Sequence, residues 1–156
     1  MSWWLNIELS GAGKEPVAAK PSAFALDGFA LLAYLEGEKG KPRVEELLRR
    51  AASGKSFLYI SLINLGEVIY ITEREKGLFL AHRVVAAIDQ LPLQIVPVSR
   101  ATVMAAAHIK ALYRISYADA FAVVAARDHH CVLLTGDPEF HSVADDGIIA
   151  VEWLPR

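Results

Sequence analysis

The sequence predicts a three-layer α/β/α fold built around a five-stranded parallel sheet, and three observations support this prediction. Strand and helix signals alternate along most of the chain, which is typical of right-handed βαβ crossovers. The run at 131–135 is apolar throughout rather than alternating, as in a strand that helices cover on both faces. The length of 156 residues is enough for one such domain with a substantial core.

In chain order, the first strand is expected at 23–26, and a first clear helical pattern begins at Lys41. Pro42 suits the first turn of a helix, because its missing N–H is not needed there. The apolar residues that follow recur at helical spacing. They are Val44, Leu47, Leu48 and Ala51. A second strand is expected at 56–61.

Helix stop signals divide the centre of the chain. One helix is expected at 62–76, because Gly77 follows it, and another at 78–91, because Pro92 follows it. A third strand is expected at 93–98, where apolar and β-branched residues predominate.

The C-terminal third is expected to contain two helices and two strands. Ser99 can cap the N-terminus of a helix that reaches Leu112. A last long helix is expected to begin at Ser116 or Tyr117 and to end near His130. The last two strands are expected at 131–135 and 148–152.

The composition is that of a compact globular protein, with 54% hydrophobic and 22% charged residues. The longest apolar stretches are about ten residues, too short to span a membrane. The net charge of -2 gives no general attraction to nucleic acid, so binding of a polyanion would need local patches and bound metal. Cys131 is the only cysteine, which excludes an internal disulfide and fits a reducing cytoplasm. We therefore expect a cytoplasmic protein.

The first 21 residues form an N-terminal extension that is distinct from the domain expected at 22–156. Every second residue from Trp3 to Leu9 is apolar, which is the pattern of a strand. The stretch from Gly11 to Pro16 has the composition of a linker. The extension is therefore either an extra strand, which could also dock on a partner, or a poorly ordered segment.

Four acidic residues lie beside apolar segments, where the sequence gives a carboxylate no evident structural role. They are Asp27, Glu67, Asp119 and Asp137. Asp and Glu are seldom buried unless they are paired, because an uncompensated buried carboxylate is unstable or takes up a proton. Four such residues in one chain indicate a shared cation.

The predicted elements bring these acids to one edge of the sheet. Asp27 ends the first strand, and Asp137 follows the fourth. Glu67 lies on the helix after the second strand, and Asp119 lies in the first turn of the last long helix. Sites in open parallel sheets form at the carboxyl ends of the strands. Oxygen ligands without accompanying Cys or His favour Mg²⁺ or Mn²⁺ over zinc and suit phosphodiester hydrolysis.

The same acids belong to four short motifs that follow one another along the chain. The motifs are Phe24-Ala25-Leu26-Asp27, Ser61-Leu62-Ile63-Asn64-Leu65-Gly66-Glu67, Ser116-Tyr117-Ala118-Asp119-Ala120 and Leu134-Thr135-Gly136-Asp137-Pro138-Glu139-Phe140. In this order they resemble the PIN-domain ribonucleases, and most of all the VapC toxins of bacterial and archaeal toxin–antitoxin pairs. The resemblance covers about 22–152, and its specificity comes from the order of the motifs, since no single motif is specific.

This resemblance implies a fold, an activity and partners. The sheet order would be 3-2-1-4-5, and the protein would be an Mg²⁺- or Mn²⁺-dependent endoribonuclease. It would hydrolyse RNA phosphodiesters with a metal-activated water, form homodimers and be neutralised by a small antitoxin protein. Asp27 and Asp119 would bind the metal ion directly, while Glu67 and Asp137 would complete the catalytic set through water.

Three further positions follow from the same resemblance. Ser116 and Thr135 match the small hydroxyl positions of the family, and they would orient carboxylates or water. Glu139 stands where a second acid often follows, and here we expect it to have a surface role. The chain departs from the pattern at Gly28, where the family commonly has Ser or Thr, so a possible hydroxyl contact is lost.

Two alternatives stay open at this point. The first is a catalytically weakened PIN domain that acts as an RNA- or antitoxin-binding module, for which Gly28 leaves room although all four acids are retained. The second is a phosphotransfer enzyme of the haloacid dehalogenase type, which has an Asp at the end of its first strand. Such an enzyme has a second Asp two residues later, whereas this chain has Phe29.

Overall fold

The computed structural model describes residues 22–156, so the strand expected between Trp3 and Ser10 lies outside the described residues. The strands are β1 (Ser22–Leu26), β2 (Ser56–Ser61), β3 (Gln94–Val96), β4 (Val132–Thr135) and β5 (Val151–Trp153). The α-helices are α1 (Gly28–Glu36), α2 (Lys41–Ala52), α3 (Leu62–Lys76), α4 (Leu78–Ile88), α5 (Arg100–Leu112), α6 (Tyr117–Asp128) and α7 (His141–Asp145). A 3-10 helix, η1 (Pro138–Phe140), precedes α7.

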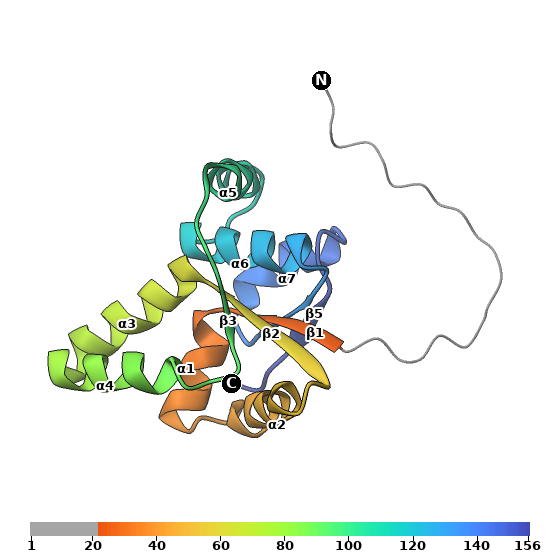
Figure 1. Ribbon diagram of the computed structural model, residues 1–156. Helices are drawn as coiled ribbons and strands as arrows, with labels where there is room; N and C mark the ends of the chain where they lie inside the picture. The colour runs from red at the N-terminus through yellow and green to blue at the C-terminus, as the bar shows by residue number, and fades with distance from the viewer. Residues whose placement is uncertain (1–21) are drawn as a thin grey trace, which may run out of the picture.

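The five strands form one parallel sheet in the order β3-β2-β1-β4-β5. Helices α5, α6 and α7 lie on one side of the sheet, and α1 and α2 lie on the other (Figure 1). The predicted fold class and the predicted strand order are therefore confirmed. Within residues 22–156, no helix combines the length and the apolar character that a membrane-spanning segment needs.

The bounds of α3 and α5 agree with the sequence, because capping residues mark their ends. The Ser61 hydroxyl accepts the N–H of Ile63 at the start of α3, and Gly77 ends this helix with a φ of 89°. At the start of α5, Ser99 and Thr102 form a capping box, in which each side chain binds the backbone of the other. These contacts are local, so they can be predicted from residue type and spacing.

Other boundaries differ from the prediction. Helix α4 ends at Ile88 instead of Leu91, because the N–H groups of Gln90 and Leu91 bond three residues back instead of four, as in tight turns. Strand β3 is shorter than the expected 93–98, and it ends just before Pro97, which has no N–H to donate to a sheet. Strand β5 begins at Val151 instead of residue 148, because the chain first turns back from α7.

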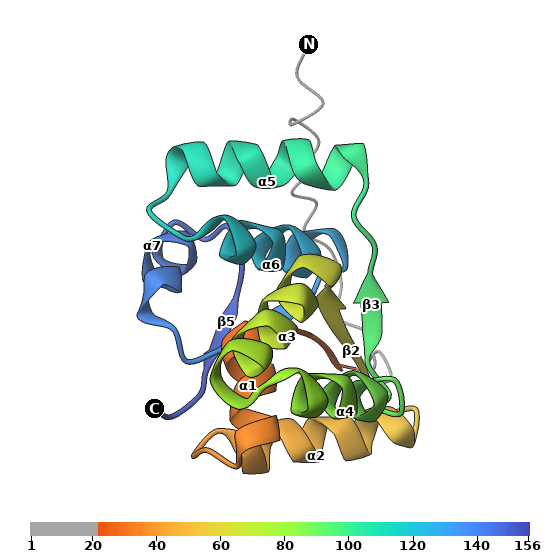
Figure 2. The ribbon, with the colours of Figure 1, turned by 90° about the vertical axis from the view of Figure 1, so that its left-hand side faces the viewer.

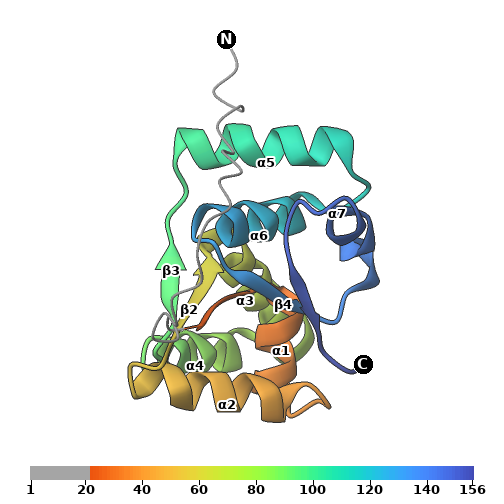
Figure 3. The same ribbon diagram turned by 90° about the vertical axis from the view of Figure 1, so that its right-hand side faces the viewer.

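The core has one layer on each face of the sheet. On β1, Ala25 packs toward α6, while Phe24 and Leu26 pack toward α1 and α2. On β4, Leu133 and Leu134 divide in the same way. The central strands are therefore buried on both faces, and β1 and β4 lie next to each other in the middle of the molecule (Figure 3).

All five strands run in the same direction, so their carboxyl ends share one edge of the sheet. The carboxyl ends of β1 and β2 lie on the left in Figure 1, and this edge faces the viewer in Figure 2. The strand order reverses between β1 and β4, and parallel sheets commonly place their sites at such a switch point.

Candidate metal centre

Asp27 follows β1 and is almost fully buried, with 1% of its surface exposed. The β1–β4 register pairs Leu26 with Leu134, so Asp27 comes to lie beside Thr135. One carboxylate oxygen accepts the N–H of Ala30 at 2.9 Å, and the other accepts the Thr135 hydroxyl at 2.5 Å. Asp27 is thus the N-cap of α1. The expectation that this acid has no structural role was wrong.

Thr135 connects the two central strands at this edge. Its buried hydroxyl donates to Asp27 and accepts the N–H of Asp137 at 3.0 Å. The Asp137 carboxylate in turn accepts the N–H of Glu139 at 2.9 Å and caps η1. Thr135 therefore fixes both the side chain of Asp27 and the backbone of Asp137.

Asp119 lies in the first turn of α6 and is 7% exposed. The helix begins because the Ser116 hydroxyl accepts the Asp119 N–H at 3.0 Å. Residues 120–126 of the helix are buried against the sheet and α5, so α6 cannot shift without disturbing the core. Ser116 therefore acts on the backbone of Asp119 and fixes where its carboxylate projects.

The structure brings Asp119, Asp137 and Glu139 together. Their carboxylate oxygens lie within 4.8 Å of one another. Glu139 is exposed, in agreement with the surface role expected from the sequence. It also belongs to this group of acids. A signal for this placement exists in the sequence, because an Asp followed by Pro favours a capped turn that would bring Glu139 back toward Asp137.

Glu67 projects from α3 and is half-buried. One turn earlier, Asn64 is fully buried, and its amide donates to the carbonyl of Ala118 at 3.0 Å. Asn64 therefore connects the helix of Glu67 to the residue that precedes Asp119. Its carbonyl oxygen is buried without a hydrogen-bond partner among the described residues. The sequence analysis missed this residue, although a polar side chain one turn from Glu67 in an apolar helix is an available signal.

Burial and mutual repulsion disturb the ionisation of these acids. Burial raises the pKa of Asp27 to about 7. The hydrogen bonds from Thr135 and Ala30 lower this pKa, whereas the charges of Asp119 and Asp137 raise it further. Burial also raises the pKa of Asp119 to about 7. The hydrogen bond from Ser116 lowers this pKa, and the charges of Asp137, Glu67 and Glu139 raise it further.

Glu67 is electrostatically coupled to the same group. Its pKa is raised by burial and by the charge of Asp137, while a hydrogen bond from Asn64 lowers it. Among residues 22–156, no Lys or Arg forms an ion pair with any of these acids. A cluster of coupled carboxylates with only oxygen donors matches the preference of Mg²⁺ and Mn²⁺.

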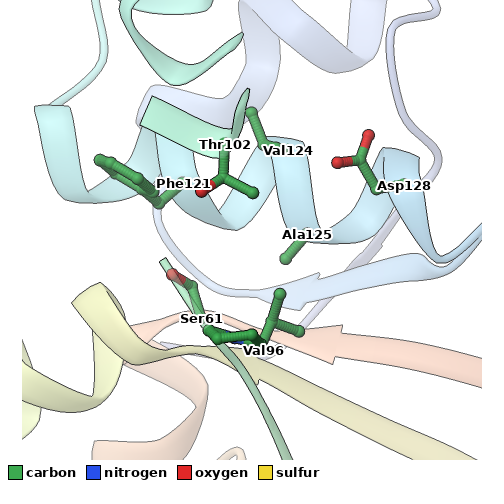
Figure 4. A pocket seen from close by; sticks show the side chains of 8 residues that line it. Ser61, Val96, Thr102, Phe121, Val124, Ala125 and Asp128 are labelled. Carbon is green, nitrogen blue, oxygen red and sulfur yellow. The ribbon is translucent and has the colours of Figure 1, made fainter. Parts of the chain in front are cut away.

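The acids lie at the edge of the sheet where the strands have their carboxyl ends. A small cavity of about 10 Å³ lies between α6 and the ends of β2 and β3, where Ser61, Val96 and Ala125 contribute to its wall (Figure 4). This volume holds about one water molecule at most. None of the acids described above lines it.

Replacing Thr135 with Val should lower the free energy of unfolding at pH 8 by about 1–3 kcal/mol, the usual cost of leaving a buried polar group unpaired. Two groups lose a partner at once, namely the ionised carboxylate of Asp27 and the N–H of Asp137. Thermal unfolding in EDTA measures the loss.

The matched control is Thr72→Val on α3, where the buried hydroxyl only bonds the carbonyl of Val68 one turn back. We expect the control to lose less stability and to show no change of the loss between pH 5 and pH 8. Equal losses for Thr135→Val and Thr72→Val at pH 8 would contradict a special role of Thr135.

The chain is similar to known proteins in both sequence and fold. In sequence, the PIN domain family matches residues 24–146 of the chain. No curated protein sequence matches it. VapBC2 from Rickettsia felis, solved bound to a DNA fragment from the promoter, is 15% identical, with a TM-score of 0.65 over 85% of this chain and 99% of that chain.

Two other solved structures are similar in the same way. Mycobacterium tuberculosis VapC20, a sarcin-ricin loop cleaving toxin, is 19% identical, with a TM-score of 0.63 over 85% of this chain and 99% of that chain. DNA-bound VapBC from Salmonella typhimurium is 17% identical, with a TM-score of 0.62 over 84% of this chain and 97% of that chain. At these identities the similarity concerns the fold.

Proposed function

Because the chain belongs to the PIN domain family, whose match spans residues 24–146, we propose that it is a metal-dependent endoribonuclease and the toxin of a VapBC-type toxin–antitoxin pair. The observation that carries the proposal is the convergence of three carboxylates, those of Asp119, Asp137 and Glu139, within 4.8 Å at the carboxyl edge of the sheet. Asp27 and Glu67 are electrostatically coupled to this group.

Mg²⁺ or Mn²⁺ would be held by these side chains. Asp27 and Asp119 are the proposed direct ligands, and Glu67 and Asp137 would act through water. Each oxygen of Asp27 accepts one hydrogen bond, and a carboxylate oxygen has a second lone pair available for an ion. Glu139 joins the proposed set because of its place in the cluster. When bound, the ion would supply a nucleophile from water and neutralise charge on the phosphodiester.

The chain's own residues prepare the site for both the ion and the substrate. With pKa values of about 7, Asp27 and Asp119 are each partly protonated near neutral pH, and binding of the ion would release these protons. The cluster repels RNA phosphates as long as no cation is bound, because like charges at close range are unfavourable. The ion would therefore be needed for substrate binding as well as for cleavage.

The purified chain should cut single-stranded or looped RNA in the presence of Mg²⁺ or Mn²⁺ and leave 5′-phosphate and 3′-hydroxyl ends. EDTA should stop the cleavage, because it competes with the oxygen ligands of the protein for the ion. Gel analysis of an end-labelled RNA measures both the products and the EDTA effect. Cleavage that survives EDTA would disprove metal dependence, and RNA binding without cleavage under any divalent ion would favour the alternative of a weakened PIN domain that acts as a binding module.

A small antitoxin and a second copy of the chain are the proposed protein partners. The support is the exposure of large apolar side chains on α3 and α4, where those of Tyr70, Leu78 and Phe79 are 55%, 54% and 77% exposed. Apolar groups that gather on a surface commonly mark a site of protein interaction. Several structures with the same fold were solved as toxin–antitoxin complexes, including one from Klebsiella pneumoniae.

Expression of the chain alone should arrest the growth of a bacterial host, because cleavage of RNA stops translation. Expression of Asp119→Ala at the same level should not arrest growth. A small antitoxin encoded next to the gene should restore growth when it is co-expressed, and light scattering should give the mass of a homodimer. Normal growth during strong expression of protein that is active in vitro would instead indicate a nuclease without a toxin role.

A further inference from the structure

Gly28 is the first residue of α1, and its missing side chain leaves the space that the Glu67 carboxylate occupies. A Cβ atom at position 28 would lie 2.8 Å from Oε2 of Glu67 and 3.3 Å from its Cδ. Real Cβ atoms essentially never approach another heavy atom to within 3.0 Å. Gly28 is not among the glycines with positive φ, so its own backbone does not require glycine. The requirement comes from Glu67.

We propose that Gly28 is a positioning residue, which by lacking a side chain lets the Glu67 carboxylate lie over the first turn of α1 beside the metal centre. The inference rests on the proposed function, because the position of Glu67 matters to an ion only if that ion binds. The absence of a side chain at Gly28 then does more than remove a possible hydroxyl contact, because it allows the Glu67 carboxylate to lie where it does.

Two features stabilise Glu67 in this position. The carboxylate lies against the N-terminal residue of α1, where the partial positive charge of the helix favours an anion. The side chain of Asn64, one turn earlier on α3, lowers the pKa of the Glu67 carboxylate and so favours its ionised form. Because Asn64 also binds the carbonyl of Ala118, the position of Glu67 is tied to the start of α6 and thus to Asp119.

A side chain at position 28 should move Glu67 without unfolding the protein. The atoms that a Cβ would meet belong to the far end of the Glu67 side chain, which is flexible and only half-buried. Rotation of that side chain relieves the clash, so the backbone does not have to shift. The expected consequence is a misplaced carboxylate in a folded domain, and this separates a positioning role from a purely structural one.

The experiment compares Gly28→Ala and Gly28→Ser in the full chain, each with wild-type Glu67 and with Glu67→Ala. Gly66→Ala is the matched control, because it makes the same change in a helix, next to Glu67, where a Cβ would meet nothing within 4 Å. Calorimetry with Mn²⁺ alone gives the dissociation constant, and thermal unfolding in EDTA gives the Tm without metal.

With Glu67 present, Gly28→Ala and Gly28→Ser should each weaken Mn²⁺ binding about tenfold, as the loss of a supporting partner of a metal site commonly does. With Glu67→Ala, neither change should alter Mn²⁺ affinity further. In EDTA, Gly28→Ala should raise the Tm more in the Glu67→Ala background, because Ala favours a helix and no clash opposes it there. Gly66→Ala should have equal effects in both backgrounds.

Equal Tm effects of Gly28→Ala in the two backgrounds would show that position 28 and Glu67 do not compete for space. Unchanged Mn²⁺ affinity in Gly28→Ala would overturn the positioning role. Tighter Mn²⁺ binding and faster cleavage by Gly28→Ser would show that the position merely lacks a hydroxyl. A wild type that binds no Mn²⁺ would disprove the proposed function, and the Tm comparison in EDTA would still decide whether Gly28 makes room for Glu67.

Discussion

Asp119→Ala should lower the rate of RNA cleavage by more than about a hundredfold, because even the loss of residues that only support a metal ligand costs about 10- to 100-fold. Asp119 is buried at the start of α6 and is one of three acids whose carboxylate oxygens lie within 4.8 Å. Its removal should therefore eliminate the ion and not merely slow the reaction. Cleavage of a fluorescently quenched RNA in Mn²⁺ at pH 8 measures the effect.

Asp128→Ala is the control at the opposite end of the same helix. Asp128 is exposed, and its ion pair with Arg127 at 3.5 Å contributes little to stability. We expect this variant to cleave at the wild-type rate. Asp27→Ala should be as inactive as Asp119→Ala, and circular dichroism must show that both fold. Substantial cleavage by folded Asp119→Ala would exclude a metal site at this edge of the sheet.

Glu139→Ala distinguishes the sequence-based view of this residue from the structural one. A surface role predicts the wild-type rate, whereas membership of the cluster predicts a loss of about tenfold or more. The two views differ because the sequence indicates a capped turn at Asp137 and Pro138 but does not show which other acids lie near that turn. The approach of Glu139 to Asp119 depends on how the turn after β4 and the start of α6 lie at the same edge of the sheet, which is a property of the folded chain.

The parts of the fold that could be predicted are those with local causes. Helices α3 and α5 have the expected bounds, because serine caps and a glycine stop act within a few residues. Helix α1 was not identified, because its sequence is apolar on nearly every side and shows no helical stripe. Helix α1 packs between the sheet and helices α2 and α3, so its burial depends on the whole fold.

The same distinction applies to the candidate site. Unusual acids next to apolar segments could be noticed in the sequence, and the strand order then explains how Asp27 and Asp137 meet. The role of Asp27 as a helix cap was hidden, since α1 had not been identified. The contacts of Asn64 with Ala118, and of Gly28 with Glu67, join residues that are distant in sequence, so no local pattern indicates them.

Asp119→Asn should raise the Tm of the metal-free protein at pH 8, because it removes one charge from a cluster that repels itself. Burial and the neighbouring acids raise the pKa of Asp119 to about 7. Each pKa unit corresponds to about 1.4 kcal/mol, so relief of even one unit of this rise should stabilise the apo protein by about 1 kcal/mol or more. For a domain of this size that is roughly 2–4 °C in Tm.

The sign of the pH dependence follows from the direction of the shift. Asp119 keeps its proton in the folded state up to its pKa of about 7, whereas in the unfolded chain it releases the proton near its ordinary pKa of 3.8. The wild type in EDTA should therefore lose stability as the pH rises from about 4 to about 7. Asp119→Asn should lose less stability over this pH range. The loss that remains should come from Asp27, whose pKa is also raised to about 7.

Mg²⁺ should reverse the ranking of the two proteins. A ligand that binds only the folded state at a hundredfold excess over its Kd stabilises it by about 2.7 kcal/mol. The wild type should gain this amount, and Asp119→Asn should lose most of it, because an amide is a poorer ligand for a divalent cation than a carboxylate. Asp128→Asn should change neither the Tm in EDTA nor the response to Mg²⁺. If Asp119→Asn instead destabilised the apo protein and kept the full Mg²⁺ response, the charge of Asp119 would be compensated by something other than a cation, and the acids at this edge would not share a metal site.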